Sequence, residues 1–170
     1  MKRTLLISAM LAALAGAPVH AGNSLLPETA TEAIALKLAK EVQQGGYSLL
    51  SVAELKKMID AREDMVLVDA HPPEEFMLAY VAGATNFGFQ SNRNGKWAED
   101  ALGKSQDDYR KLLGPDKGRK IVIYCGFVKC GRSHNAAMWA KEFGYTYIHR
   151  VPGGISAWMD AGYPYKTNLK

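Results

Sequence analysis

The sequence predicts a single α/β domain built on a mostly parallel β-sheet. Short apolar segments with strand character alternate with helical segments, which is the pattern of parallel sheets covered by helices. Two segments, Met65–Asp69 (MVLVD) and Ile121–Tyr124 (IVIY), are almost continuously apolar, as strands buried on both faces are. The chain has 170 residues, enough for one domain with a sizeable core.

The elements follow each other in a regular order. Pro27–Gln44 carries apolar residues at helical spacing and ends at two glycines, which is typical of a helix stop. Tyr47–Leu50 is extended, and Ser51 and Glu54 form a capping box for a helix that reaches about Ala61. The remaining elements are strand Met65–Asp69, a short helix in His71–Phe76, strand Ala84–Phe87, a helical centre around Trp97–Leu113, strand Ile121–Tyr124, helix Ser133–Phe143, strand Thr146–Arg150 and helix Ile155–Ala161.

The first residues predict an exported protein. Lys2 and Arg3 precede the apolar run Leu5–Ala17, and the small residues up to Ala21 suit cleavage by a signal peptidase after that position. At about 13 residues the apolar run is too short to span a bilayer comfortably, so a cleaved signal peptide is expected rather than a retained anchor. We therefore expect a periplasmic protein that begins at Gly22 and does not stay at the membrane.

The expected organisation has four parts. Residues 1–21 form the signal peptide, 22–46 an N-terminal helical extension, 47–165 the main domain and 166–170 a C-terminal tail. Loss of Lys2 and Arg3 lowers the formal net charge from +4 to +2. That charge is too small, and the basic residues are too scattered, to predict binding to nucleic acid.

Both cysteines of the chain, Cys125 and Cys130, lie directly after the strand Ile121–Tyr124. The carboxyl ends of parallel strands are where such sheets bind ligands. The N–H groups of a loop that leads into a helix favour an anion, and the same field lowers the pKa of a thiol toward its reactive thiolate. This segment therefore predicts a nucleophilic cysteine in an anion cradle.

Three further motifs stand in order around the cysteine loop. VLVD (66–69) is followed by EEF (74–76), GATN lies at 83–86, and GGISAW (153–158) is followed by GYP (162–164). With these motifs the chain resembles the single-domain rhodaneses, a family of thiosulfate-type sulfurtransferases, over roughly Tyr47 to Pro164. Any one of the motifs alone would be a weak signal.

The resemblance implies a three-layer rhodanese-like fold, with a five-stranded, mostly parallel sheet flanked by helices. It also implies that Cys125 attacks the outer sulfur of thiosulfate or a similar anionic donor, releases sulfite and holds a persulfide. A thiol or cyanide then takes the sulfur, and neither a cofactor nor a metal is implied. The residues expected to cradle the anion are Gly126, Phe127, Val128, Lys129, Gly131, Arg132 and Ser133, of which Lys129 and Arg132 attract it, and Asp69 and His71 are expected to support the site.

The loop departs from the family pattern. Arg132 stands seven positions after Cys125, so the loop is longer than usual and Cys130 occupies the extra stretch. Related phosphatases have their arginine one position nearer, which counts against phosphatase chemistry. His71 stands where the family usually has arginine, and the region of Tyr80 replaces a usual histidine. These departures leave the physiological donor open.

Other interpretations of the cysteines stay open. Two cysteines in an oxidising compartment default to a disulfide, which fits a periplasmic thiol–disulfide redox protein or a catalytically silent binding module. A metal site of Cys125, Cys130 and His134 matches no common zinc spacing. Sulfur transfer and redox chemistry combine if Cys130 attacks a Cys125 persulfide, releases sulfide and leaves a disulfide. The expected partners are then a small anionic sulfur donor and a thiol acceptor or reductant protein.

Several neighbouring residues have structural interpretations. Asp69 is expected to bond backbone near the loop, and His71 is interpreted as a solvated turn residue, with substrate contact as the alternative. Ser133 is expected either to cap its helix or to bond the substrate. Trp139 and Trp158 are predicted to lie in the core.

Overall fold

The computed structural model describes residues 26–169, so the predicted signal peptide and its cleavage site lie outside the described residues. Five strands form one sheet in the order β1-β5-β4-β2-β3, and every neighbouring pair is parallel. The predicted fold class is confirmed. The strands are β1 (Ser48–Leu49), β2 (Val66–Asp69), β3 (Thr85–Asn86), β4 (Ile121–Tyr124) and β5 (Ile148–Val151).

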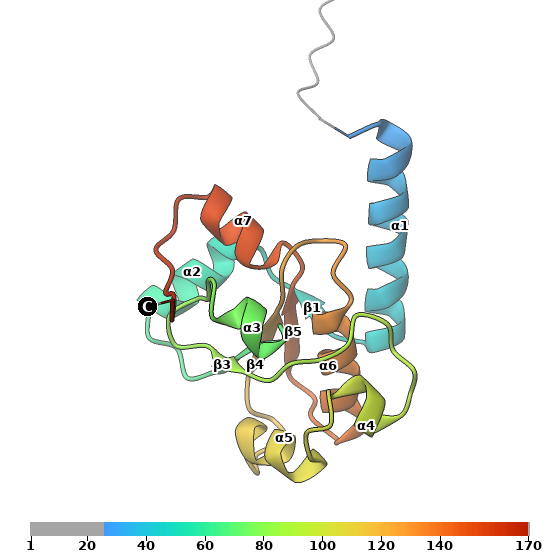
Figure 1. The fold of residues 1–170 in the computed structure, drawn as a ribbon, viewed down its shortest axis with the longest axis vertical. Coiled ribbons are helices and arrows are strands. Elements are labelled where there is room, and N and C mark those ends of the chain that lie inside the picture. The colour runs from blue at the N-terminus through green and yellow to red at the C-terminus, as the bar shows by residue number, and fades with distance from the viewer. Residues whose placement is uncertain (1–25, 170) are drawn as a thin grey trace, which may run out of the picture.

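Helices cover both faces of the sheet (Figure 1). Alternate residues of the central strands point to opposite faces, so Val68 and Ile123 join one apolar cluster and Leu67 and Val122 the other. The helices are α1 (Glu28–Gly45), α2 (Val52–Asp60), α3 (Pro73–Phe76), α4 (Trp97–Asp100), α5 (Gln106–Leu113), α6 (Arg132–Glu142) and α7 (Gly154–Asp160). The first cluster is completed by α1, α4, α5 and α6, and the second by α2 and α7.

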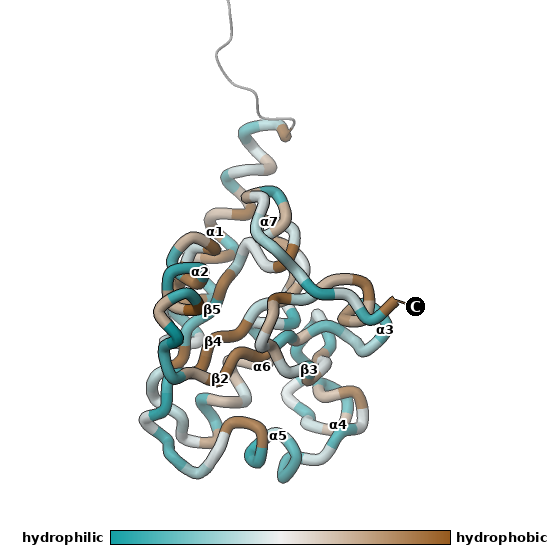
Figure 2. Tube along the Cα trace, turned by 90° about the vertical axis from the view of Figure 1, so that its left-hand side faces the viewer, coloured by the Kyte–Doolittle hydropathy of each residue, from teal (hydrophilic) through white to brown (hydrophobic). Residues whose placement is uncertain are grey.

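The hydrophobic residues of β2, β4 and β5 lie inside these layers (Figure 2). Burial on both faces explains why IVIY and VLV read as continuous apolar runs rather than alternating ones. Trp139 and Trp158 are both buried in the core, as predicted.

The predicted helical centre around Trp97–Leu113 is wrong as a continuous element. It contains two short helices, α4 and α5, with a turn between them. Leu102 and Gly103 have φ of 53° and 76°, which no right-handed helix accommodates, and Ser105 then caps α5 afresh by accepting a bond from the N–H of Asp108.

The helix α1 leaves the body of the domain at its N-terminal end and lies along α6 at its C-terminal end (Figure 1). Its first three turns are mainly exposed, whereas Glu41 and Gly45 in its last turns are buried. No helix in residues 26–169 is long and apolar enough to cross a membrane. The segment expected as a C-terminal tail pairs with residues 77–80, because Tyr80 and Lys166 exchange two backbone bonds of 2.8 and 2.9 Å.

The register of β2 and β4 brings the segment Asp69–His71 close to the start of the cysteine loop. Asp69 and Tyr124 are direct neighbours in the sheet, so Asp69–His71 and Cys125 leave it side by side. The start of α7 closes the same edge, where the N–H of Ile155 donates to the carbonyl of Cys125 at 2.8 Å.

Candidate active site

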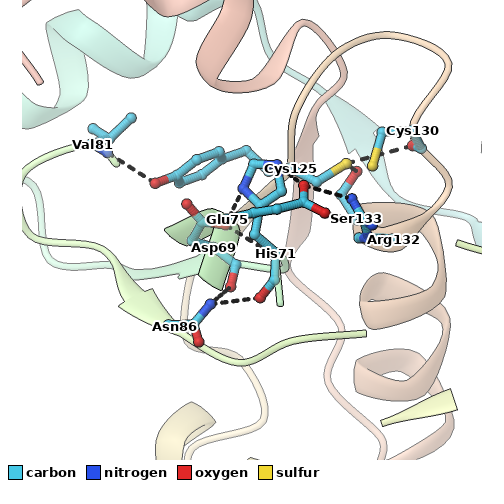
Figure 3. A network of polar contacts seen from close by, with 10 residues as sticks. Asp69, His71, Glu75, Val81, Asn86, Cys125, Cys130, Arg132 and Ser133 are labelled. Carbon is cyan, nitrogen blue, oxygen red and sulfur yellow. Dashed lines mark hydrogen bonds and ion pairs between the residues drawn. The ribbon is translucent and has the colours of Figure 1, made fainter. Parts of the chain in front are cut away.

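Cys125 lies directly after β4 and is buried, with 1% of its surface exposed. Its thiol donates to the hydroxyl of Ser133, with 3.2 Å between Sγ and Oγ. A longer contact of 3.5 Å joins the same sulfur to the carbonyl oxygen of Cys130 (Figure 3). The sulfur is thus surrounded by polar groups of its own loop, as a nucleophile that changes charge requires.

The loop between Cys125 and α6 is folded tightly rather than extended. The N–H of Cys130 donates to the carbonyl of Phe127 at 2.9 Å, which closes a turn. Phe127, Val128 and Lys129 form the exposed tip of this turn, whereas Cys130 is buried beneath it. The extra length of this loop therefore serves to fold Cys130 back under the turn.

Three glycines allow this close packing. A Cβ on Gly131 would lie 2.2 Å from the carbonyl oxygen of Ser91, and a Cβ on Gly126 would lie 3.1 Å from Nε2 of His71. Gly154 has a φ of 60°, and its Cβ would lie 2.1 Å from the carbonyl oxygen of Cys125. The glycines quoted from the sequence thus let three backbone segments meet at the loop.

The N–H groups of Gly126 and Arg132 stabilise the thiolate of Cys130. The neighbouring Cys125, these N–H groups and the charge of Arg132 outweigh burial and lower the pKa of Cys130 to about 5. Burial and the neighbouring Cys130 raise the pKa of Cys125, which its bonds to Ser133 oppose. Both thiols are unlinked.

Arg132, expected to attract an anion, is engaged with a carboxylate. Its two terminal nitrogens bond both oxygens of Glu75 at 3.0 and 2.9 Å. This pairing compensates much of the guanidinium charge that an incoming anion would meet. Lys129 is exposed at the loop tip, and its side chain has no ion-pair partner within residues 26–169.

The interpretation of His71 as a solvated turn residue is wrong, because its ring is buried with 4% exposed. Nδ1 lies 2.8 Å from the carboxylate of the fully buried Asp69, and Nε2 lies 3.6 Å from Glu75. Asp69 also accepts a bond from the backbone N–H of His71 at 2.9 Å. Burial alone would lower the pKa of His71, but Asp69, with help from Glu75 and Cys130, raises it overall.

Ser133 does not cap α6, contrary to one expectation. The N-cap position is Gly131, which offers no side chain, and Ser133 lies inside the first turn. Its hydroxyl instead lies between Cys125 and Arg150, whose Nε donates to it at 2.8 Å. Ser133 is therefore part of the site through its oxygen and not through helix capping.

Arg150 is the site residue that the sequence reasoning missed. It lies on β5 and is completely buried, and it bonds Ser133, the carbonyl of Cys130, Tyr47 and Glu41. The sequence did offer one signal, which is that Arg150 belongs to a strand expected to be buried. A buried charge almost always has bonding partners, so Arg150 could have been expected to bond other polar residues. Its main charged partner, Glu41, lies more than a hundred residues away in sequence, which no local pattern reveals.

Two further polar residues near the start of α6, His134 and Asn135, form hydrogen bonds to residues outside the helix. Nδ1 of His134 and the hydroxyl of Tyr47 share a hydrogen bond of 2.8 Å. Burial lowers the pKa of His134 to about 4, which leaves the ring neutral. The amide of Asn135 donates to the carbonyl of Gln90 at 3.1 Å. Within residues 26–169, no three His, Cys, Asp or Glu side chains are grouped so as to hold a metal ion.

A cleft of about 220 Å³ opens beside the loop. His71 and Glu75 line one part of it, Gly126 and Phe127 another, and Met159 of α7 contributes an apolar wall. The cleft is large enough for a small anion or the end of a thiol side chain, and it lies against the backbone of the residue that follows Cys125.

The chain is similar to known proteins in sequence and in fold. The family model described as a rhodanese-like domain matches residues 51–161. The thiosulfate:glutathione sulfurtransferase of Saccharomyces cerevisiae is 24% identical over 116 residues, 66% of this chain and 78% of the yeast protein. Thiosulfate sulfurtransferase 16, chloroplastic, of Arabidopsis thaliana is 31% identical over 101 residues, 59% of this chain and 78% of that protein. The polysulfide-sulfur transferase of Wolinella succinogenes has the same fold, with a TM-score of 0.56 at 16% identity over 82% of this chain and 91% of the other.

Proposed function

The chain belongs to the rhodanese family, as its three motifs predict, and on that premise we propose that it is a sulfurtransferase whose nucleophile is Cys125. The observation that carries the proposal is the placement of Cys125, at the end of a central strand and in contact with the Ser133 hydroxyl. Two relatives named as thiosulfate sulfurtransferases support the substrate class, a small anion that carries sulfane sulfur.

The proposed reaction has two displacements. The Cys125 thiolate attacks the outer sulfur of thiosulfate, the S–S bond of the donor breaks, and sulfite leaves with the bonding electron pair. An acceptor thiolate or cyanide then attacks the outer sulfur of the Cys125 persulfide and returns Cys125 as a thiolate. The chain's own groups provide the nucleophile and the hydrogen bonds to its negative charge, so no cofactor enters the scheme.

Cys130 affects the first displacement through its charge. Its sulfur is the better stabilised thiolate of the pair, and its negative charge is one cause of the raised pKa of Cys125. With a pKa of about 5 the Cys130 thiolate is a weak base, so we assign it no proton transfer from Cys125.

Direct contact of two buried thiols favours a second candidate function. The Cys130 thiolate attacks the inner sulfur of a Cys125 persulfide, the outer sulfur leaves as hydrosulfide, and a Cys125–Cys130 disulfide forms. An external dithiol must then reduce that disulfide by two electrons before the next cycle. In this scheme the protein converts sulfane sulfur to sulfide and depends on a reductant partner.

The cellular setting is proposed from the sequence alone. A cleaved signal peptide would place the chain in a bacterial periplasm. The modest positive charge and the exposed Lys129 at the loop tip suit an anionic donor.

The test compares sulfite released from thiosulfate by the wild-type protein, Cys125→Ser and Cys130→Ser under reducing conditions. Sulfite from wild type and none from Cys125→Ser supports sulfur transfer through Cys125. Sulfide that appears with wild type and disappears with Cys130→Ser supports the second scheme. If wild type releases sulfite from none of thiosulfate, thiosulfonates and polysulfide, the enzyme proposal is wrong and a binding module remains.

A further inference from the structure

A chain of hydrogen bonds joins the N-terminal helix α1 to the nucleophile. Glu41 on α1 accepts from Nη1 of Arg150 at 2.5 Å, and Nε of Arg150 donates to Ser133 at 2.8 Å. Ser133 contacts the sulfur of Cys125 at 3.2 Å. Three elements distant in sequence therefore meet in one continuous path, and Glu41 lies outside the residues matched by the family model.

The guanidinium of Arg150 directs two of its donors to the end of the loop that leads into α6. Nη2 donates to the carbonyl of Cys130 at 2.9 Å, while Nε donates to Ser133, which follows the loop. Nη1 also donates to Tyr47 at 3.1 Å. Arginine suits this position because its donors point in fixed directions, so loop and strand are held in one geometry.

The chemistry of Arg150 fixes the direction of the bond at Ser133. A guanidinium can only donate, so the Ser133 oxygen accepts from Arg150. The hydroxyl hydrogen of Ser133 is then left for Cys125 whenever that sulfur is a thiolate or a persulfide. Bonding to a cation polarises the hydroxyl and makes it a stronger donor.

Because Arg150 is buried, the positive and negative charges along this hydrogen-bond path must compensate each other. Arg150 is fully buried, so its charge requires the carboxylate of Glu41 as a counter-ion. Burial alone would lower the pKa of Arg150, but Glu41 and Tyr47 raise it overall, and the guanidinium is charged. The charged and titratable groups around the two thiols are His71, Glu75, Arg132, Arg150 and Glu41.

We propose that Arg150 and Glu41 are positioning residues for the nucleophile, and that helix α1 thereby completes the active site. Arg150 orients the Ser133 hydroxyl toward Cys125 and holds the loop through the Cys130 carbonyl. Glu41 sets how much positive charge the thiols experience. The inference rests on the proposed function only in taking Cys125 as the nucleophile.

The test follows the alkylation of Cys125 by iodoacetamide as a function of pH in the full-length chain. Trypsin cleaves after Lys129, so mass spectrometry follows Cys125 and Cys130 in separate peptides. Glu41→Gln removes one negative charge and keeps the shape, so we expect the midpoint of Cys125 alkylation to fall by about one pH unit. The matched control is Glu32→Gln, the same substitution at an exposed position of α1, which should leave the midpoint unchanged.

A second pair of variants tests the hydroxyl. Ser133→Ala removes a donor to the thiolate and should raise the midpoint, whereas Ser133→Thr keeps the hydroxyl and should restore it. The proposal is overturned if Glu41→Gln, folded by circular dichroism, titrates like Glu32→Gln. It is overturned equally if Ser133→Ala leaves the midpoint where it was. Alkylation needs no sulfur donor, so these results stand whether or not the protein transfers sulfur.

Discussion

At the scale of single residues, His71 couples the site to pH. Its pKa in the folded protein is raised above 6.5, because the contact with Asp69 and the charges of Asp69, Glu75 and Cys130 together outweigh burial. A raised pKa means that the protonated ring stabilises the fold fully below the unfolded value, and that this contribution is lost as the pH rises through the folded pKa. His71 thus links the charge of the cleft to the stability of the domain.

We predict that His71→Asn removes this pH dependence. The stability difference between wild type and variant should be largest near pH 5.5 and should shrink by pH 8.5, as His71 loses its proton. Urea unfolding at several pH values measures it, since a change in midpoint at constant slope reports stability. A difference that stays constant over this range would mean that His71 contributes through packing alone.

The buried pair of Glu41 and Arg150 makes a second residue-scale prediction. Glu41→Met leaves a fully buried cation without its counter-ion and should cost about 3–5 kcal/mol of unfolding free energy. Replacement of both residues by methionine should cost less than the sum of the single changes, because no uncompensated charge remains. A double-mutant cycle from urea unfolding measures this coupling, and additive effects would show that the two side chains do not act as a pair.

At the scale of elements, the junction of β4, the cysteine loop and α7 carries the geometry of the site. Two bonds join them, from the N–H of Ile155 to Cys125 at 2.8 Å and from the N–H of Ser156 to Gly126 at 2.9 Å. Gly154 lets α7 begin against the loop because it combines a φ of 60° with the absence of a side chain. The motif GGISAW therefore has a physical reason here, which is the approach of one backbone to another.

We predict that Gly154→Ala displaces the loop and abolishes most sulfite release from thiosulfate. The matched control is Gly162→Ala, whose φ of 71° is as strained for alanine but whose Cβ would meet nothing within 4 Å. Both variants should lose about 1 kcal/mol or more from backbone strain, and only Gly154→Ala should also lose activity. Equal activity of the two variants, measured with both folded, would show that the close approach to Cys125 is unimportant.

Some of these elements could be predicted from the sequence and others could not. The strands β2 and β4 and the helices beside them followed from apolar pattern, caps and glycines, because those signals are local. The break at Leu102 and Gly103 was missed although its signals, Gly103 and the capping Ser105, are local too, because the residues on both sides favour helix. His71 is drawn inward by Asp69, and Arg150 by Glu41, and both effects depend on contacts that arise only on folding.

At the scale of the whole molecule, the chain combines a family domain with a helix that the family model does not include. The match covers residues 51–161, yet α1 supplies Glu41 to the buried arginine and Lys37 to the carbonyl of Lys129 at 3.0 Å. The N-terminal extension is therefore joined to the cysteine loop by two separate contacts. The exposed first turns of α1 lead back toward the segment that the sequence predicts to be removed on export.

The predicted signal peptide gives the last test, because it decides where this chemistry takes place. We expect protein expressed from the full sequence in a Gram-negative bacterium to be found in the periplasm and to begin at Gly22, since small residues precede that position. Cell fractionation with mass spectrometry of the intact protein measures both. Ala21→Arg places a large charged side chain at the cleavage position and should yield uncleaved precursor, whereas Ala21→Ser should be processed normally. Wild-type protein that keeps its first 21 residues and stays in the cytoplasm would contradict export, and with it the oxidising compartment on which the disulfide alternative depends.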